Sequence, residues 1–255
     1  GKRYWNDGTP VAGQQFEYKF DDIGNRAGDE AVMTGGDASG ANLRAFEYEV
    51  NCLNQYTMRN GPTSVDILGL GSPGTTVTVN GSPADYRRGE YFREDLTVAN
   101  GSAAVWQGVT NTVGGTTVTG NIFVPAAQEF FSYDLDGNLT GDGRWTYTWD
   151  AENRLKEMVA QSNIPDLAKR KLVFAYDHIG RRCQMTVYTN LSGGWSLAYN
   201  HRLIYDGWNL IAQANTSDNT LVKSFTWGQD LSGTMEDAGG IGGLLIFTDH
   251  SSPTT

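Results

Sequence analysis

The stretch Tyr176-Asp177-His178-Ile179-Gly180-Arg181-Arg182 contains the unit from which much of this chain is built. The unit is an aromatic residue, Asp, two variable residues, then Gly or Asn followed by Asn or Arg. Further copies begin at Phe20, Tyr133, Trp149 and Tyr205, and the last of these is one residue shorter. Repetition of a short unit along a chain indicates an array of similar supersecondary structures.

Each copy ends a run in which apolar residues alternate with others, as Trp145, Tyr147 and Trp149 do. This period of two predicts a strand. The Asp accepts hydrogen bonds from backbone N–H groups further along, and the Gly or Asn tolerates positive φ, so the unit predicts strand, turn and strand. We assign this structural role to Phe20, Asp21, Gly24, Tyr133, Asp134, Gly137, Trp149, Asp150, Tyr176, Asp177, Gly180, Tyr205 and Asp206.

The composition favours strands and tight turns over helices, because the 255 residues include 32 Gly, 7 Trp, 12 Tyr and 10 Phe. The expected fold class is all-β. A short hairpin cannot bury its aromatic face alone, so successive hairpins are expected to form a curved or spiralling antiparallel sheet.

The charge balance argues against a nucleic-acid partner, since 19 Lys and Arg face 29 Asp and Glu for a net charge of −10. The sequence has no long apolar run and no charged-then-apolar leader. We therefore expect no membrane insertion and no signal peptide within this fragment.

The Tyr-Asp-x-x-Gly-Asn/Arg unit resembles the YD repeat of RHS proteins. The start of the RHS-associated core region is similar to residues 205–211, 225–233 and 238–245. A recurrent segment of bacterial members is similar to residues 53–57. The resemblance implies a sheet that spirals into a hollow shell, as in RHS toxins, insecticidal toxin complexes and teneurins. It also implies a bacterial protein that is secreted or lies at the cell surface. Because the family's core continues with further repeats, and in toxin members with a variable effector, the chain is expected to be a piece of a longer one.

Residues 70–126 have a different pattern. Strands running into Asn-Gly turns are expected within 75–81 and 91–101, with two more at 103–109 and 116–124. This order resembles small bacterial Ig-like modules and implies an inserted β-sandwich. The expected division is repeat strands over 1–69, the insert over 70–126, repeat and core strands over 127–249, and a flexible tail over 250–255.

The sequence offers little support for a metal, a cofactor or a catalytic nucleophile. The Gly69–Gly74 run matches G-x-G-x-x-G, but a Thr/Val strand follows it in place of a helix, so a loop is expected. An acidic cluster, Asp134, Asp136, Asn138 and Asp142, lacks the Glu that ends a calcium loop. The histidines His178, His201 and His250 have no metal-ligand spacing. Cys52 and Cys183 form one disulfide or remain free thiols, and the sequence leaves both open.

Trp145, Tyr147 and Trp149 lie on one side of an expected strand and would either pack inside a shell or, if exposed, form a platform for sugar rings. The function expected from these features is that of a non-enzymatic structural segment, part of a β-sheet shell or an extracellular interaction surface. Its expected partners are the remaining repeats of a longer parent chain, an enclosed polypeptide or a cell-surface glycan. The alternatives are a carbohydrate-binding module that uses exposed aromatics, and a glycan-active hydrolase or lyase with paired carboxylates.

The turn assignment makes a testable prediction. Asp177→Ala removes the acceptor of turn hydrogen bonds and is expected to lower the melting temperature. Circular dichroism melts of the two proteins measure the difference, and superimposable curves would count against the assignment.

Overall fold

The computed structural model describes residues 1–191, 193–235 and 242–251. Within these ranges the expected all-β fold is confirmed: the strands pair antiparallel, and one 3₁₀ turn, Asp166–Ala168, is the sole helical element. Residues 238–241 of the core-like segment and 252–255 of the expected tail lie outside the described residues. The chain forms two compact units. Unit 1 comprises Gly1–Trp145 and Gln161–Ala168, and unit 2 comprises Thr146–Ala160 and Lys169–Thr255.

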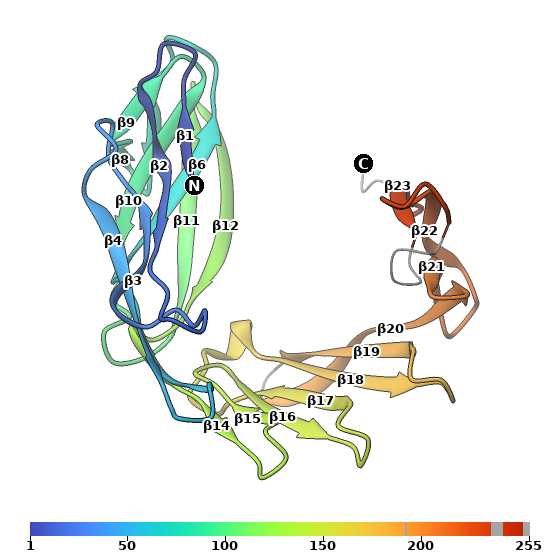
Figure 1. The fold of residues 1–255 in the computed structure, drawn as a ribbon. Helices are drawn as coiled ribbons and strands as arrows, with labels where there is room; N and C mark the ends of the chain where they lie inside the picture. The colour runs from blue at the N-terminus through green and yellow to red at the C-terminus, as the bar shows by residue number, and fades with distance from the viewer. Residues whose placement is uncertain (192, 236–241, 252–255) are drawn as a thin grey trace. The chain divides into compact units, whose positions relative to one another are not determined.

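Unit 1 contains a six-stranded sheet with the order β1-β2-β3-β4-β5-β13 (Figure 1). Its strands are β1 (Lys2–Tyr4), β2 (Pro10–Tyr18), β3 (Gly28–Gly35), β4 (Leu43–Val50), β5 (Tyr56–Asn60) and β13 (Gln128–Phe130). Val11, Ala12 and Ala31 are buried on this sheet. Strand β13 pairs with β5 although a long stretch of sequence separates the two strands. The residues between them form two further sheets.

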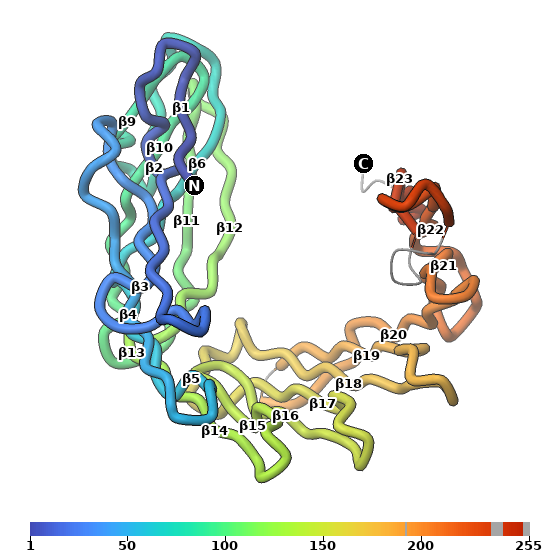
Figure 2. The backbone as a smooth tube through the Cα atoms, viewed as in Figure 1, coloured from blue at the N-terminus to red at the C-terminus, as the bar shows by residue number. Residues whose placement is uncertain are grey.

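These are a three-stranded sheet, β6-β10-β9, and a four-stranded sheet, β12-β11-β7-β8. The course of the backbone through β6, β10, β11 and β12 can be followed in Figure 2. Val77, Val79 and Phe92 are buried between the two sheets, with Ile67, Val109 and Val113 packed against them. The strands are β6 (Ser64–Leu70), β7 (Val77–Val79), β8 (Ser82–Pro83), β9 (Tyr86–Arg88), β10 (Tyr91–Thr97), β11 (Val105–Val113) and β12 (Thr116–Val124). Because β6 pairs with β10, residues before position 70 also take part in the three-stranded sheet.

The strands from β14 onward pair in sequence order, each with the next, as a succession of hairpins. They are β14 (Ser132–Tyr133), β15 (Leu139–Gly141), β16 (Trp145–Trp149), β17 (Leu155–Ala160), β18 (Arg170–Tyr176), β19 (Arg182–Leu191), β20 (Gly194–Asp206), β21 (Asn209–Asn215), β22 (Leu221–Gly228) and β23 (Gly243–Asp249). Leu155, Met158 and Val159 also have helical spacing, but hydrogen bonding to β18 makes this segment a strand.

One turn, which we call the Asx turn, joins many of these strands. In the copy that starts at Asp177, the Asp177 N–H donates to the Arg181 carbonyl at 2.9 Å, and the Gly180 N–H donates back to Asp177. The Asp177 carboxylate accepts the N–H groups of Ile179 and Arg181. The same backbone pattern begins at Asp21, Asp37, Asn51, Asp134, Asp150 and Asp230.

The fourth residue of every Asx turn has positive φ, from 57° at Asn153 to 93° at Gly24. This conformation favours Gly and Asn, which explains why each turn has one of these two residue types at that position. The hydrogen bonds also lower the pKa of Asp21, Asp134 and Asp150. At Asp37 the bonds from the Ser39 side chain and backbone bring the pKa to about 2.

The positive φ of Gly180, 86°, makes a further prediction. A Cβ at this position meets no heavy atom within 4 Å, so the cost of Gly180→Ala is backbone strain alone, about 1 kcal/mol of unfolding free energy. Gly180→Asn is the matched control and is expected to cost less, because Asn occupies this place in another copy. Urea unfolding measures both, and equal losses would contradict the explanation.

Candidate functional site

The aromatic residue of one repeat contacts the turn of the repeat before it. The Tyr176 hydroxyl donates to the Leu155 carbonyl at 2.8 Å, directly after the Asx turn that starts at Asp150. The guanidinium of Arg154, the last residue of that turn, lies 5.1 Å from the Tyr176 ring centroid and donates to Asp150 at 2.8 Å. This turn therefore provides a carbonyl and a cation for the next tyrosine.

The next repeat has the same contacts. Tyr205 donates to the Arg182 carbonyl at 3.0 Å, and the Arg181 guanidinium lies 5.1 Å from the Tyr205 ring. Burial raises the pKa of the Tyr205 hydroxyl, which stays a neutral donor. In unit 1, Tyr133 donates to the Tyr56 carbonyl, directly after the turn that starts at Asn51.

Two of the residues assigned to the repeat are placed differently. Asp206 pairs with Asn209 across a two-residue loop and so starts no Asx turn, because its copy is one residue short. Phe20, which has no hydroxyl, is 58% exposed, and its backbone bridges to Arg26. Trp145, Tyr147 and Trp149 lie on β16 and are each half-buried, whereas the threonines between them are exposed. A role of these rings as a sugar platform remains a prediction.

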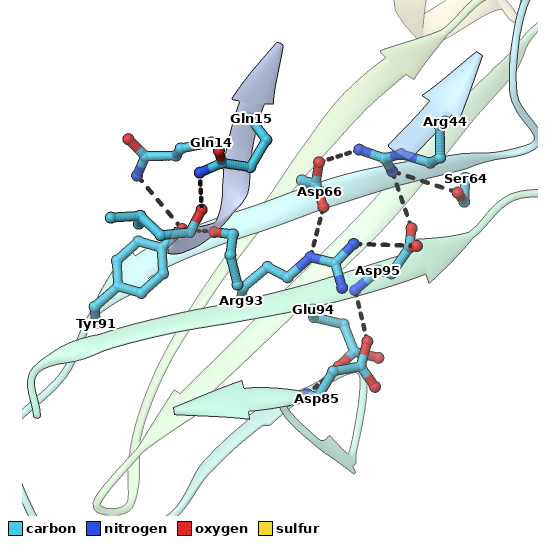
Figure 3. A network of polar contacts seen from close by, with 12 residues as sticks. Gln14, Gln15, Arg44, Ser64, Asp66, Asp85, Tyr91, Arg93, Glu94 and Asp95 are labelled. Atoms are coloured by element: carbon cyan, nitrogen blue, oxygen red, sulfur yellow. Dashed lines mark hydrogen bonds and ion pairs between the residues drawn. The ribbon is translucent and has the colours of Figure 1, made fainter. Parts of the chain in front are cut away.

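Unit 1 also contains a buried cluster of charged residues that the sequence analysis missed (Figure 3). Asp66 on β6 accepts from Arg44 on β4 and, at 2.8 Å, from Arg93 on β10. Asp95 accepts from the same two arginines, at 2.9 Å and 3.1 Å. The cluster therefore joins the six-stranded sheet to the three-stranded one. The side chains of Arg44, Arg93 and Asp66 are 8–14% exposed, which leaves no room for a substrate.

Two glycines provide the space for this cluster. Gly35 has a φ of 93°, and a Cβ there would lie 2.9 Å from both the Arg44 guanidinium and the Asp66 carboxylate. A Cβ on Gly13 would meet Leu68 at 2.8 Å and Arg93 at 3.2 Å. These distances are too short for a larger residue, so the buried charged cluster requires glycine at both positions.

A second buried carboxyl, Glu129 on β13, pairs with Arg59 on β5. Burial raises the pKa of Glu129, while Arg59 opposes the rise. Glu129 is 5% exposed, and a Cβ on Gly143 would clash with it at 2.3 Å. A raised carboxyl pKa is typical of a general acid or base, but a group this enclosed cannot reach a substrate. We therefore interpret this pair as structural.

A cavity of about 970 Å³ in unit 1 is open to solvent and lies between β1, the loop that follows it, β6 and β10. Trp5 and Tyr91 form its aromatic wall, with ring centroids 5.7 Å apart and an interplanar angle of 73°. The Arg88 guanidinium lies 4.9 Å from the Trp5 ring and donates to Asp7 at 2.5 Å. We call this space the Trp5 pocket. It is lined by both aromatic and charged groups, and it can admit a ligand.

The other candidate residues show no catalytic or metal-binding arrangement. Among the described residues, no group of three or more His, Cys, Asp and Glu could hold a metal ion. His201 on β20 is buried, contacts Gln213 at 2.5 Å and stacks on Tyr199, and burial lowers its pKa. Cys52 and Cys183 are free thiols. No helix in the described ranges is long and apolar enough to cross a membrane.

By sequence, the chain is similar to curated nucleases of Bacillus. It is 34% identical over 147 residues to the tRNA3(Ser)-specific nuclease WapA of Bacillus spizizenii, and 35% identical over 102 residues to the tRNA nuclease WapA of Bacillus subtilis strain 168. The first alignment covers 57% of this chain and 5% of the relative, and the second covers 40% and 4%. These matches support an RHS-type protein, as the repeats indicated.

The other comparisons add less. No protein-family model matches the chain. Among solved structures, TcdB2-TccC3-TEV aligns over 90% of this chain and 13% of its own length, with 10% identity and a TM-score of 0.23. TcdB2-TccC3 without its hypervariable C-terminal region has a TM-score of 0.21. Scores this low carry no argument about function.

The names of the relatives correct three expectations from the sequence. A non-enzymatic structural segment, the absence of an enzyme and the absence of a nucleic-acid partner are each contradicted, because the relatives are named tRNA nucleases. The carbohydrate-binding and glycan-cleaving alternatives are not confirmed. The reason is that net charge and motif content describe this chain alone, whereas the alignment covers 5% of the Bacillus spizizenii relative.

The buried cluster makes the prediction of this subsection. Asp66→Asn keeps the side-chain volume but leaves two buried guanidinium groups short of a carboxylate, so we expect a loss of about 3 kcal/mol of unfolding free energy. Asp7→Asn is the control, because it breaks an arginine pair at the surface, where such pairs contribute little. Urea unfolding compares the two, and similar small losses would refute the importance of the cluster.

Proposed function

We propose that this chain is part of a bacterial RHS-type protein that cleaves tRNA and is secreted or displayed at the cell surface. The observation that carries the proposal is the 34% identity over 147 residues to a relative named as a tRNA nuclease. Two further relatives, both 35% identical over 102 residues, are also named as tRNA nucleases. The activity belongs to the whole protein, of which the chain is a part.

The geometry agrees with a protein in which this chain has structural and binding roles and another part cleaves the RNA. Cleavage of an RNA phosphodiester needs an acid, a base and a cation that reach the reacting phosphate. In the described ranges, the strongest ion clusters, around Asp66 and Glu129, are enclosed by packed side chains. We therefore assign no catalytic residue to them. The open Trp5 pocket is a place in unit 1 that RNA can contact.

Two finer assignments are part of the same proposal. We propose that residues 70–126 are an Ig-like module, supported by the two facing sheets around Val77, Val79 and Phe92. We also propose that the repeat residues act in sheet building, supported by the Asx turns and by the tyrosine contacts between successive repeats.

Incubation of the complete protein encoded by the gene that contains this chain with bulk tRNA tests the function. Shortened tRNA, resolved on a denaturing gel, is the expected result. A 5S ribosomal RNA and a DNA oligonucleotide of similar length serve as controls for unspecific degradation. Intact tRNA under conditions in which the protein is folded would contradict the proposal, and equal loss of all three nucleic acids would contradict its specificity for tRNA.

A further inference from the structure

We propose that the Trp5 pocket binds a single ribonucleotide, with an unstacked base against the aromatic wall and the phosphate at Arg3. This inference rests on the proposed function for its ligand class, since a tRNA nuclease meets ribonucleotides in unpaired loops. The pocket itself is defined by its own geometry. Its volume of about 970 Å³ lies in the range of small-molecule sites.

The walls of the pocket are held in place before any ligand binds. The Tyr91 hydroxyl donates to the Ala12 carbonyl at 2.6 Å, and burial raises its pKa, so the ring is fixed as a neutral phenol. Arg88 is fixed by Asp7 and by the Thr9 hydroxyl, and it covers the Trp5 ring. A rigid pocket loses little conformational entropy when a ligand binds.

The chemistry of the walls fits a heterocyclic base. Proteins recognise unpaired RNA bases by stacking them on aromatic rings or on arginine guanidinium planes and by bonding their polar edges. Trp5 and Arg88 provide such planes, and the buried Tyr91 supports the Trp5 ring edge to face. Asn6 and Glu90, both exposed at the rim, provide an amide and a carboxylate that can bond to base edges.

The charges of the walls assign the phosphate to Arg3. Asp7 neutralises Arg88, and this ion pair lowers the pKa of Asp7. Arg3 instead donates to the neutral side-chain amide of Gln14 at 2.8 Å, and none of the described residues gives it a carboxylate partner. Gln14 in turn donates to the Tyr91 hydroxyl at 3.4 Å, which places Arg3 beside the aromatic wall. A guanidinium of this kind can form two parallel hydrogen bonds to a phosphate.

Calorimetric titration of the 255-residue chain with AMP, GMP, CMP and UMP, and with adenosine, tests the site. We expect saturable binding of at least one mononucleotide. Arg3→Gln is expected to weaken AMP binding about tenfold or more, towards the affinity of adenosine, and to leave adenosine binding unchanged. Trp5→Leu is expected to weaken both.

Matched controls separate the pocket from unspecific effects. Arg202 is also exposed and donates to a neutral amide, that of Asn219, so Arg202→Gln removes the same charge elsewhere. Trp208 is 49% exposed outside the pocket, so Trp208→Leu is the control for Trp5. Both controls should bind nucleotides as the unmodified chain does. Flat titrations at millimolar concentration, or equal losses in the controls, would overturn the proposal.

The two proposals can fail separately. Nucleotide binding by this chain, together with a complete protein that leaves tRNA intact, would sustain the pocket and refute the nuclease function. Cleavage of tRNA by a complete protein whose rate and KM are unchanged by Arg3→Gln and by Trp5→Leu would sustain the nuclease function and refute a role for the pocket in it.

Discussion

The contact on which the repeat strands depend is the hydrogen bond from a tyrosine hydroxyl to the turn of the preceding repeat. Tyr176 and Tyr205 each donate to the carbonyl directly after an Asx turn, and each ring lies under the arginine that ends that turn. Donor and acceptor belong to successive repeats and lie on paired strands, β18 with β17 and β20 with β19. The contacts therefore connect each repeat to the one before it, which explains why the same residue types recur along the chain.

Unit 1 combines this repeat with a second way of joining sheets. Its buried cluster joins β4 to β6 and β10 through two arginines and two aspartates. Burying charges costs hydration, and the cost is offset only when each charge has several partners. The glycines at 13 and 35 allow this approach, because any side chain there would occupy the space of the charged groups. The ion pairs of the buried cluster therefore require the backbone conformation that glycine adopts at positions 13 and 35.

The proposed roles divide between enclosed and open parts of the molecule. The ion clusters around Asp66 and Glu129 are enclosed and hold strands together, whereas the Trp5 pocket is open and has one arginine bonded to a neutral amide. The net charge of −10 argued against nucleic acid for the chain as a whole. A local site does not need a basic chain, since recognition of one nucleotide requires a stacking surface and a single well-placed cation.

The sequence by itself determined the fold class, the strand-turn-strand unit and the turns at Asp21, Asp134, Asp150 and Asp177, because alternation and turn chemistry are local. It missed the turns at Asp37, Asn51 and Asp230, which have no aromatic residue before them, and the short copy at Asp206 forms a two-residue loop in place of an Asx turn. Arg93 and Asp95, two residues apart on one strand face, were the available signal for the buried cluster. Only the tertiary structure brought them to Arg44 and Asp66, and Trp5 to Tyr91, since strand pairing between segments distant in sequence sets these contacts.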